Sequence, residues 1–344
     1  MNQDWQNFLT TRGAHIADGV VQHFGNAAAE RAATQEGTVL CDLSHFGVLR
    51  VSGEDAESFL QNLLSNNIRE VTASRAQLSS FNNAKGRMLA SFLIWREGGG
   101  DYLLQLPLAL AEPIRKRLSM YVLRAKVKIT DASNDTVCLG VAGKAAATLL
   151  QAHFPVLPQQ PWEVTQSDEA AILCRSAQRY QIATSVERAR ALWQALQPAA
   201  TAAGANCWDW LDIRAGIPFI LPATQEAFVP QMVNFEVIGG VNFKKGCYPG
   251  QEVVARMHYL GKPKRRMYLA RVMTDEAIQA GDELFSANQA DQACGKVVQA
   301  ARAAHGGFEL LAVVQTEIAL DFPVHLKTLT GTRLEFEPLP YTLP

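Results

Sequence analysis

The side chains best suited to chemistry are concentrated in one stretch of eleven residues, Asn242 to Glu252. It reads Asn-Phe-Lys-Lys-Gly-Cys-Tyr-Pro-Gly-Gln-Glu, and its apolar residues follow neither the period of a strand nor that of a helix. Pro249-Gly250 indicates a turn, and proline also suits the first turn of a helix. We therefore expect a short helix over 251–257, directly after the turn.

The cysteine of this stretch is its most reactive group. Cys247 precedes the expected helix and follows Lys244 and Lys245. Because cations and a helix N-terminus both favour a thiolate, this thiol is a candidate for unusual acidity and reactivity. The residue types alone leave a second interpretation open, a tight glycine turn that holds a half-buried, inert cysteine.

The order of these residues resembles a known family signature. Residues 244–252, followed by Val254-Ala255-Arg256, are similar to the motif K-G-C-Y-x-G-Q-E of the YgfZ family, folate-binding relatives of the glycine cleavage system T protein, an aminomethyltransferase. Further similarity at 42–45, 83–88 and 337–341 extends the resemblance over nearly the whole chain. It implies a folate-binding accessory protein that supports synthesis or repair of iron–sulfur enzymes, including tRNA-modifying ones. Its partners would be iron–sulfur client enzymes or assembly proteins.

The resemblance also implies which residues hold the ligand, tetrahydrofolate or a related reduced folate. These are Asn83, Lys85, Arg87, Arg214, Gln231, Asn234, Lys245, Tyr248, Gln251, Glu252 and Arg256. Other interpretations remain for some of them. The stretch 82–87 is also typical of an ordinary hairpin tip with solvated charges, and the amides at 231 and 234 also suit a polar loop.

Two positions depart from the family pattern. In the T protein the catalytic aspartate follows the hairpin turn, but Ala90 stands there, and alanine can neither accept a proton nor orient an amine. We therefore expect no aminomethyl transfer and, as the first interpretation, no catalysis. Arg214 replaces a glutamate that contacts the pterin ring, and a guanidinium offers only hydrogen-bond donors. Asp212 is a neighbouring carboxylate, but on a helix it points elsewhere.

Composition limits the possible partners. The 344 residues carry 32 basic and 33 acidic side chains, so the chain as a whole is not built to coat nucleic acid. A compact basic run does follow Gly261, and it consists of Lys262, Lys264, Arg265 and Arg266. Such a run is usually a solvated face. The alternative is a local site for a glutamate tail or for a weak contact with RNA.

The six cysteines are widely spaced, without a C-x-x-C pair or a nearby set of cysteines and histidines. We therefore expect no metal site held by this chain alone, and mostly reduced, buried thiols. No apolar run reaches the roughly 18 residues of a membrane span, and no signal peptide is apparent, so a cytoplasmic protein without membrane contact is expected.

The elements that must position these residues read as an α+β protein. After a helical segment over 1–37, the order β-α-β-β-α occurs twice, which predicts two ferredoxin-like domains in tandem, 38–132 and 133–245. The signature and a linker follow at 246–262. Short strands at 267–272, 295–300, 308–314 and 324–329 predict an antiparallel β-barrel over 263–344. The resemblance implies the same arrangement, three T-protein-like domains around a central cavity.

Two rival functions remain beside the folate-binding accessory protein. One is a folate-dependent one-carbon transferase or demethylase, against which Ala90 argues. The other is a tRNA-binding module built on the basic run, for which a steep salt dependence of RNA binding would be diagnostic.

Overall fold

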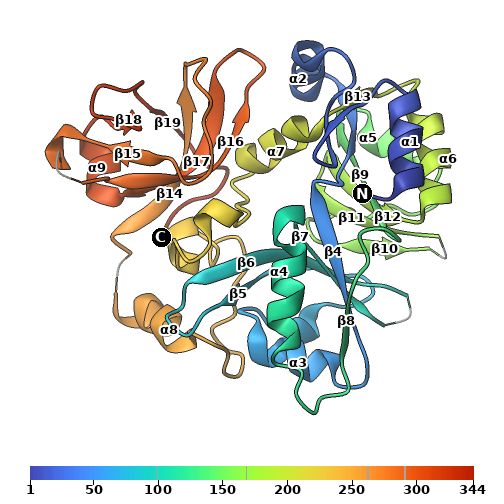
Figure 1. Ribbon diagram of the computed structural model, residues 1–344, viewed down its shortest axis with the longest axis horizontal. Helices are drawn as coiled ribbons and strands as arrows, with labels where there is room; N and C mark the ends of the chain where they lie inside the picture. The colour runs from blue at the N-terminus through green and yellow to red at the C-terminus, as the bar shows by residue number, and fades with distance from the viewer. Residues whose placement is uncertain (99, 168, 262, 290–291) are drawn as a thin grey trace. The chain divides into compact units, whose positions relative to one another are not determined.

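A computed structural model describes residues 1–98, 100–167, 169–261, 263–289 and 292–344 (Figure 1). The chain forms two compact units, each built from three separate segments of sequence. The first unit comprises residues 1–59, 68–77 and 93–208, and the second comprises 60–67, 78–92 and 209–344. Four elements contain residues of both units: α3 (Ala56–Leu63), β5 (Gln77–Asn82), β6 (Met88–Arg96) and α7 (Ala205–Arg214).

A six-stranded sheet forms one layer of the first unit, in the order β10-β11-β12-β9-β3-β13. Its strands are β3 (Thr38–Asp42), β9 (Val137–Gly143), β10 (Val164–Gln166), β11 (Ala170–Ser176), β12 (Arg179–Thr184) and β13 (Thr201–Ala203). Neighbouring strands are antiparallel, except that β13 runs parallel to β3. On β9, a Cβ at Gly140 would lie 2.4 Å from the Trp208 ring, so only glycine permits this packing.

Helices cover this sheet and complete the core of the first unit. α1 (Gln3–Thr11), α5 (Ala146–Gln151) and α6 (Val186–Leu196) lie beside it (Figure 1) and bury Trp5, Leu150 and Trp193 against its strands. The Trp5 Nε1–H donates to Asp42 Oδ1 at 2.7 Å, which ties α1 to β3. Burial raises the pKa of Asp42, so this carboxylate depends on the indole and on Ser44 for its stabilisation.

A second sheet of the first unit contains β4 (Phe46–Ser52), β7 (Tyr102–Pro107) and β8 (Lys128–Asp131), with β4 in the middle. Residues 93–96 of β6 pair with the other edge of β7. α4 (Leu108–Ser119) packs against these strands and buries Leu110, Ile114 and Leu118, the apolar face that its sequence predicts.

The N-terminal 52 residues differ from the sequence expectation. A helical segment was expected over 1–37, but the hairpin of β1 (His15–Ala17) and β2 (Val20–His23) separates α1 from α2 (Ala27–Glu36). Gly13, Gly19 and Gly25 all have positive φ, which the helix would not permit. The apolar pattern of residues 39–51 also predicts a single strand, but the strand is divided at 43–45, and β3 and β4 belong to different sheets.

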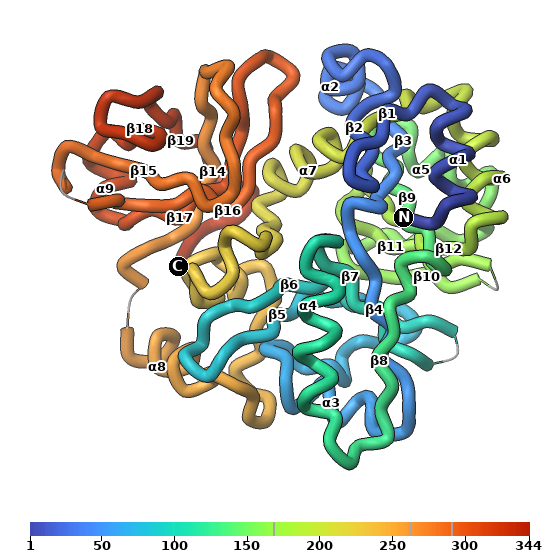
Figure 2. Tube along the Cα trace, in the orientation of Figure 1, coloured from blue at the N-terminus to red at the C-terminus, as the bar shows by residue number. Residues whose placement is uncertain are grey.

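The second unit contains the end of α3, the tip of the β5–β6 hairpin and the chain from the end of α7 onward. Residues 217–240 are irregular, with only the 3₁₀ turns η2 (Pro222–Thr224) and η3 (Pro230–Val233), and Figure 2 traces them as a loop. α8 (Gln251–Leu260) follows the signature, which confirms the short helix expected there.

The rest of the second unit is a six-stranded antiparallel sheet in the order β18-β15-β16-β17-β14-β19. Its elements are β14 (Arg265–Val272), β15 (Glu283–Phe285), β16 (Gly295–Arg302), β17 (Phe308–Gln315), α9 (Thr316–Asp321), β18 (His325–Leu326) and β19 (Glu335–Glu337). Leu310, Ala312 and Val314 alternate along β17 and face one core. The sheet is a half-barrel. This confirms the antiparallel architecture expected for this region, but it does not confirm a closed barrel.

Among the described residues, every helix is too short or too polar to cross a lipid bilayer. The described residues also contain no group of three or more His, Cys, Asp and Glu side chains arranged to hold a metal ion.

Candidate functional site

The tip of the β5–β6 hairpin, residues 83–87, is held by its own side chain. Asn83 Oδ1 accepts hydrogen bonds from the amides of Lys85 and Arg87, at 2.9 and 3.0 Å, and closes an Asx turn. Gly86 has a φ of +71°, which the turn requires. Asn83 therefore shapes the loop, while Lys85 projects into solvent.

The hairpin tip packs against the start of α8 through two glycines. Gly250, the N-cap residue of α8, has a φ of +77°, and a Cβ there would lie 2.4 Å from the Asn83 carbonyl oxygen and 2.5 Å from Gly86 Cα. Two segments that are far apart in sequence thus meet backbone to backbone. The Pro-Gly-Gln-Glu part of the signature positions a helix on the hairpin.

Lys245 is turned away from solvent. Its ammonium donates to the carbonyl oxygens of Gln61, Leu64 and Asn66, at and beyond the C-terminal end of α3. These carbonyls lack helical partners, and a cation there also complements the helix dipole. All three N–H groups have acceptors, so this geometry favours a structural role for Lys245.

Cys247 lies in the extended part of the signature loop, before α8, and is exposed, whereas the other five cysteines of the chain are buried. The neighbouring Tyr248 is buried, and its hydroxyl has no hydrogen-bond partner among the described residues. The ring of Tyr248 lies 5.1 Å from the Lys245 ammonium, within cation–π range. Lys245 and Tyr248 therefore anchor the loop from below and leave Cys247 accessible.

The remaining residues of the predicted site fall into two groups. Gln231 and Asn234 are buried and donate to the backbone, Gln231 Nε2 to Val254 O at 2.6 Å and Asn234 Nδ2 to Met267 O at 2.8 Å. Glu252 and Arg256 are exposed on α8. Gln251 Nε2 lies 3.5 Å from the Lys245 carbonyl oxygen, which is the outer limit of a hydrogen bond.

The ion-pair partners of Arg214 lie on the half-barrel and not on the hairpin tip. Its Nη1 is 2.6 Å from Glu337 Oε2 and 3.5 Å from Glu309 Oε2, on β19 and β17. Burial raises the pKa of Glu309, and the Arg214 charge acts in the opposite direction. The guanidinium thus joins the end of α7 to the half-barrel. Asp212, the neighbouring carboxylate, is fully buried.

Ala90 is completely buried in β6, at the position where the family pattern has a carboxylate. The next side chain, Ser91, accepts a hydrogen bond from the Ile220 amide at 3.0 Å through its Oγ. A methyl group and an occupied hydroxyl therefore stand where proton transfer would need a free acid or base.

The basic run does not form one solvated face. Lys264 is exposed and Arg265 partly so, but Arg266 is buried and pairs with Glu236, both side chains being 8% exposed. Both the solvated face and the alternative of a partner site are wrong for Arg266, because its Nη1 also donates to the Gln231 carbonyl oxygen at 2.9 Å. Lys262 lies outside the described residues.

The segment 225–228 was not predicted from the sequence, yet it docks onto the start of β6. The Met88 amide donates to Phe228 O and the Glu226 amide to Met88 O, both at 2.8 Å, while Arg87 Nη1 donates to Ala227 O at 2.5 Å. The only signal in the sequence is the extended backbone that Pro230 favours just before it. This docking directs Arg87 into the protein's own backbone.

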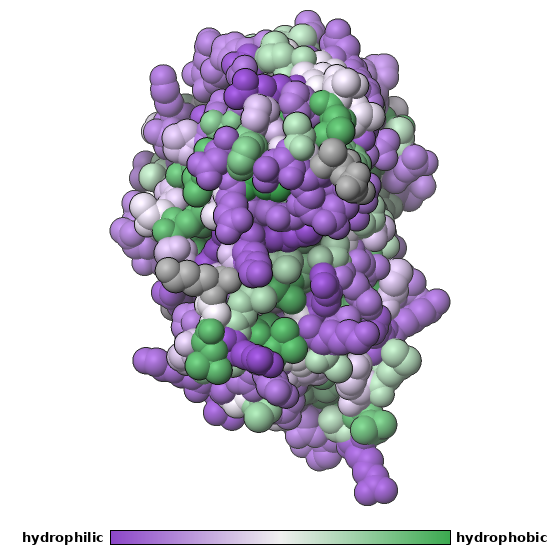
Figure 3. All heavy atoms as spheres, turned by 90° about the vertical axis from the view of Figure 1, so that its left-hand side faces the viewer, coloured by the Kyte–Doolittle hydropathy of each residue, from purple (hydrophilic) through white to green (hydrophobic). Residues whose placement is uncertain are grey.

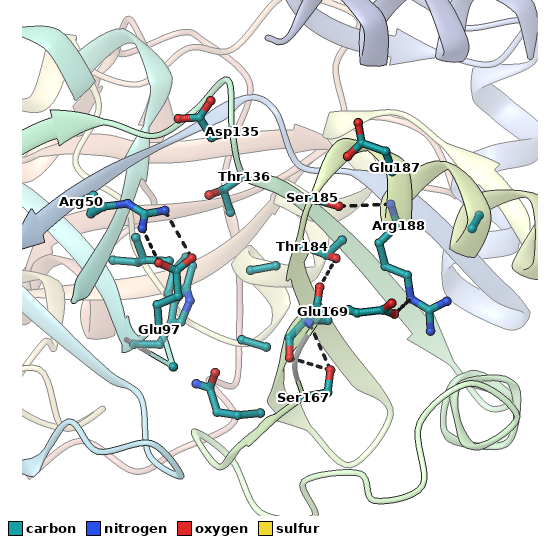
Figure 4. Close-up of a pocket in the computed structure, with 18 residues that line it drawn as sticks. Arg50, Glu97, Asp135, Thr136, Ser167, Glu169, Thr184, Ser185, Glu187 and Arg188 are labelled. Carbon is teal, nitrogen blue, oxygen red and sulfur yellow. Dashed lines mark hydrogen bonds and ion pairs between the residues drawn. The ribbon is translucent and has the colours of Figure 1, made fainter. Parts of the chain in front are cut away.

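The first unit contains a separate cavity of about 960 Å³, and none of the predicted site residues lines it. Figure 4 shows its two arginines already paired, Arg50 with Glu97 and Arg188 with Glu169. Asp135 and Glu187 add negative charge (Figure 4). The cavity has no excess of cations for an anionic ligand.

Comparison with solved structures defines the class of protein. Glycine cleavage system aminomethyltransferase T from Bartonella henselae is similar, with a TM-score of 0.82 over 99% of this chain and 97% of that chain, at 19% sequence identity. The chain therefore has the α+β fold of the T protein, with several sheets and a C-terminal antiparallel half-barrel.

Comparison with known sequences defines the family. The family described as the GCVT N-terminal domain matches residues 8–210. A tRNA-modifying protein YgfZ from Edwardsiella ictaluri (strain 93-146) is 32% identical over 299 residues, 86% of this chain and 89% of that protein. One from Klebsiella pneumoniae (strain 342) is 30% identical over 307 residues, 88% and 93% of the two chains. The chain belongs to the YgfZ family of tRNA-modifying proteins, which confirms the resemblance seen in the signature.

Proposed function

We propose that this protein is a folate-binding accessory protein that supports synthesis or repair of iron–sulfur enzymes, including tRNA-modifying ones, without aminomethyl transfer. The observation that carries the proposal is the signature loop, which presents the one exposed cysteine of the chain and packs its Gly250 against the hairpin tip. The buried alanine at position 90 argues against the rival one-carbon transferase or demethylase. The six cysteines form no disulfide bonds, which is typical of a reducing compartment, so we also propose a cytoplasmic location.

The residues of the site fit the anionic end of a reduced folate better than its pterin ring. Lys85 and Arg256 are exposed cations on the hairpin tip and α8, and they would bind the glutamate tail. Asn83 and Gln251 would shape the loops around it. Arg214 already pairs with two carboxylates, so the pterin would need a different acceptor. A bound folate would supply one-carbon or redox chemistry that the side chains here lack.

The finer architecture belongs to the same proposal. The order β8-β4-β7-β6 around α4 is the strand order of a ferredoxin-like domain, and β9, β11, β12, α5 and α6 repeat it with β3 inserted beside β9. We propose two related halves on this basis, followed by a barrel that the half-barrel sheet would complete.

Titration with a stable reduced folate tests the proposal. A ligand at a hundred times its Kd stabilises the folded state by about 2.7 kcal/mol, so the melting temperature should rise by several degrees. Lys85→Ala combined with Arg256→Ala should reduce that rise. Lys116→Ala, an exposed cation on α4, is the matched control and should leave it unchanged. A melting temperature that stays constant at high ligand excess would show that the protein does not bind folate.

A further inference from the structure

The second unit contains a cavity of about 740 Å³ that the folate proposal does not use. α8, β14, the segment after η3 and the start of α9 enclose it, and its walls include Gln231, Glu236, His258, Lys264, Tyr268 and Thr316. Its volume is within the range of small-molecule sites and is sufficient for a nucleotide.

Three oxygen atoms of residues that line this cavity have no hydrogen-bond donor within the described part of the chain. Arg266 pairs with one oxygen of Glu236, while Glu236 Oε2, Gln231 Oε1 and Thr316 Oγ1 have no partner among the described residues. Buried polar atoms are nearly always paired, so three such atoms in one cavity indicate a guest that donates N–H groups. Two cations and two carboxylates line the cavity, Lys264 and Arg266 with Glu236 and Glu317, which suits a neutral guest.

An exposed aromatic stack adjoins the cavity. The rings of Phe243 and His258 lie parallel, with centroids 3.7 Å apart and planes at 10°, and His258 also lines the cavity. Tyr259 meets both rings edge-on and is 65% exposed. Figure 3 views the side on which α8 and the half-barrel lie, and hydrophobic residues are scattered there among hydrophilic ones. This surface therefore carries a small aromatic platform, next to the exposed Leu260 of α8.

The segments that carry the platform also carry exposed cations. Lys244 precedes the signature cysteine, Arg256 lies on α8, and Lys264 is at the cavity, while Glu252 and Glu317 are the exposed acids of the same segments. The local excess is positive although the chain carries a net charge of −1. Single-stranded nucleic acids are bound by this combination, with cations on the phosphates and bases stacked on aromatic rings.

We propose that the cavity and the aromatic stack bind an unstacked base of a single-stranded RNA loop. A base that carries an exocyclic amine, adenine, cytosine or guanine, would donate to the free oxygens of Glu236 and Gln231. A neighbouring base would stack on Tyr259 and His258. The inference deepens the proposed function and rests on it for the choice of RNA over DNA.

Fluorescence anisotropy with labelled single-stranded eight-mers of A, C and U at low salt tests the proposal. We expect A and C strands to bind more tightly than U, since uracil has no amine. Tyr259→Ala and His258→Ala should each weaken binding about tenfold, the usual loss for one stacked base. Thr316→Val keeps the shape of the side chain and should reduce the preference for A over U. Lys264→Ala should lower the salt slope by about one phosphate contact.

Matched controls distinguish specific binding at this site from nonspecific binding of RNA to the protein. Tyr121 is an exposed aromatic residue of the first unit, and Tyr121→Ala should leave the affinity for RNA unchanged. Melting curves of each variant establish that it is folded. No saturable binding to any strand would overturn the proposal, as would an equal loss with Tyr121→Ala. Excess AMP should displace an A strand, because it carries the same base, whereas displacement by reduced folate but not by AMP would identify a small-molecule cavity instead and would also overturn the proposal. The folate-dependent melting shift is a separate measurement, so either proposal can fail alone.

Discussion

Neighbouring residues of the signature have different tasks. Lys245 satisfies three carbonyl groups at the end of α3, Tyr248 is buried beneath the loop, and Cys247 between them is exposed. A half-buried cation with a full set of acceptors holds the loop in one conformation. The exposed thiol is then presented at a fixed place instead of on a mobile tip.

Lys245 leads to a prediction about pH. Burial lowers its pKa to about 8, while the pKa of a lysine in an unfolded chain is about 10.4. Between these values the unfolded chain binds more protons than the folded one, so the stability contributed by this site rises with pH and its burial cost is fully present below pH 8. The difference in free energy of unfolding between the native protein and Lys245→Met should therefore increase by about 2 kcal/mol from pH 8 to 10, measured by urea titration. A difference that shrinks over this window would mean that the carbonyl groups stabilise the ammonium more than burial opposes it.

Cys247 leads to a prediction about reactivity. Burial raises the pKa of Cys138 to about 12 and that of Cys174 to about 11, and it also raises the pKa of Cys41 and Cys294. These thiols are both hidden and protonated near pH 7. Brief iodoacetamide treatment followed by mass spectrometry should find Cys247 modified first, and all six cysteines modified only after denaturation. Faster labelling of any buried cysteine would contradict this order.

At the scale of elements, the hairpin tip and α8 depend on each other. Gly250 lies against Asn83 and Gly86, and the amide of Gln231 bonds to the backbone of α8 from the other side. The signature is thus a junction between a hairpin, a helix and a loop. Its glycines should differ in importance according to what surrounds each one.

Three alanine substitutions separate backbone strain from crowding. Gly246→Ala meets no atom within 4 Å at an ordinary φ and should change the free energy of unfolding by less than about 0.5 kcal/mol. Gly239→Ala has the same open space but a φ of +79°, so it should cost about 1 kcal/mol. Gly250→Ala combines positive φ with a backbone contact at 2.4 Å and should cost more than about 2 kcal/mol. Chemical denaturation measures this series, and equal losses at 239 and 250 would rule out the close contact.

At the scale of the whole molecule, chain order and compact units do not coincide. Each unit takes three segments of the sequence, and β3 finds both its partners, β9 and β13, far along the chain. The half-barrel is different, since its core cluster lies entirely between Ala270 and Leu334. The sequential domains 38–132, 133–245 and 263–344 therefore remain a prediction. The core cluster of the half-barrel supports the third of them, while the long-range pairing of β3 argues against the boundary at 132.

Isolated fragments test those domains. Fragment 263–344 contains its whole core and should melt cooperatively by circular dichroism. Fragment 38–132 leaves β3 without either neighbour and should show no cooperative transition. Extending that fragment to 1–208 supplies both neighbours and should restore one. Cooperative melting of 38–132 alone would support the sequential boundary at 132.

The sequence by itself determined the features that depend on local patterns. Amphipathic α4 and α6, the apolar strands β6 and β7, and the helix after Pro249-Gly250 follow from periodicity and turn chemistry. The signature residues likewise identify the family, because their order is specific. The missing acid at Ala90 is also readable from one position.

Only the tertiary structure decided which long-range partner each polar group takes. Arg266 reads as part of a solvated run, but Glu236 buries it; Arg214 reads as a ligand contact, but it pairs with Glu337 and Glu309. One apparent strand divides into β3 and β4 because its two halves find partners in different sheets. The type and spacing of side chains specify which bonds a residue can form. The partner itself is selected by the fold, because it brings together groups that are far apart in the sequence.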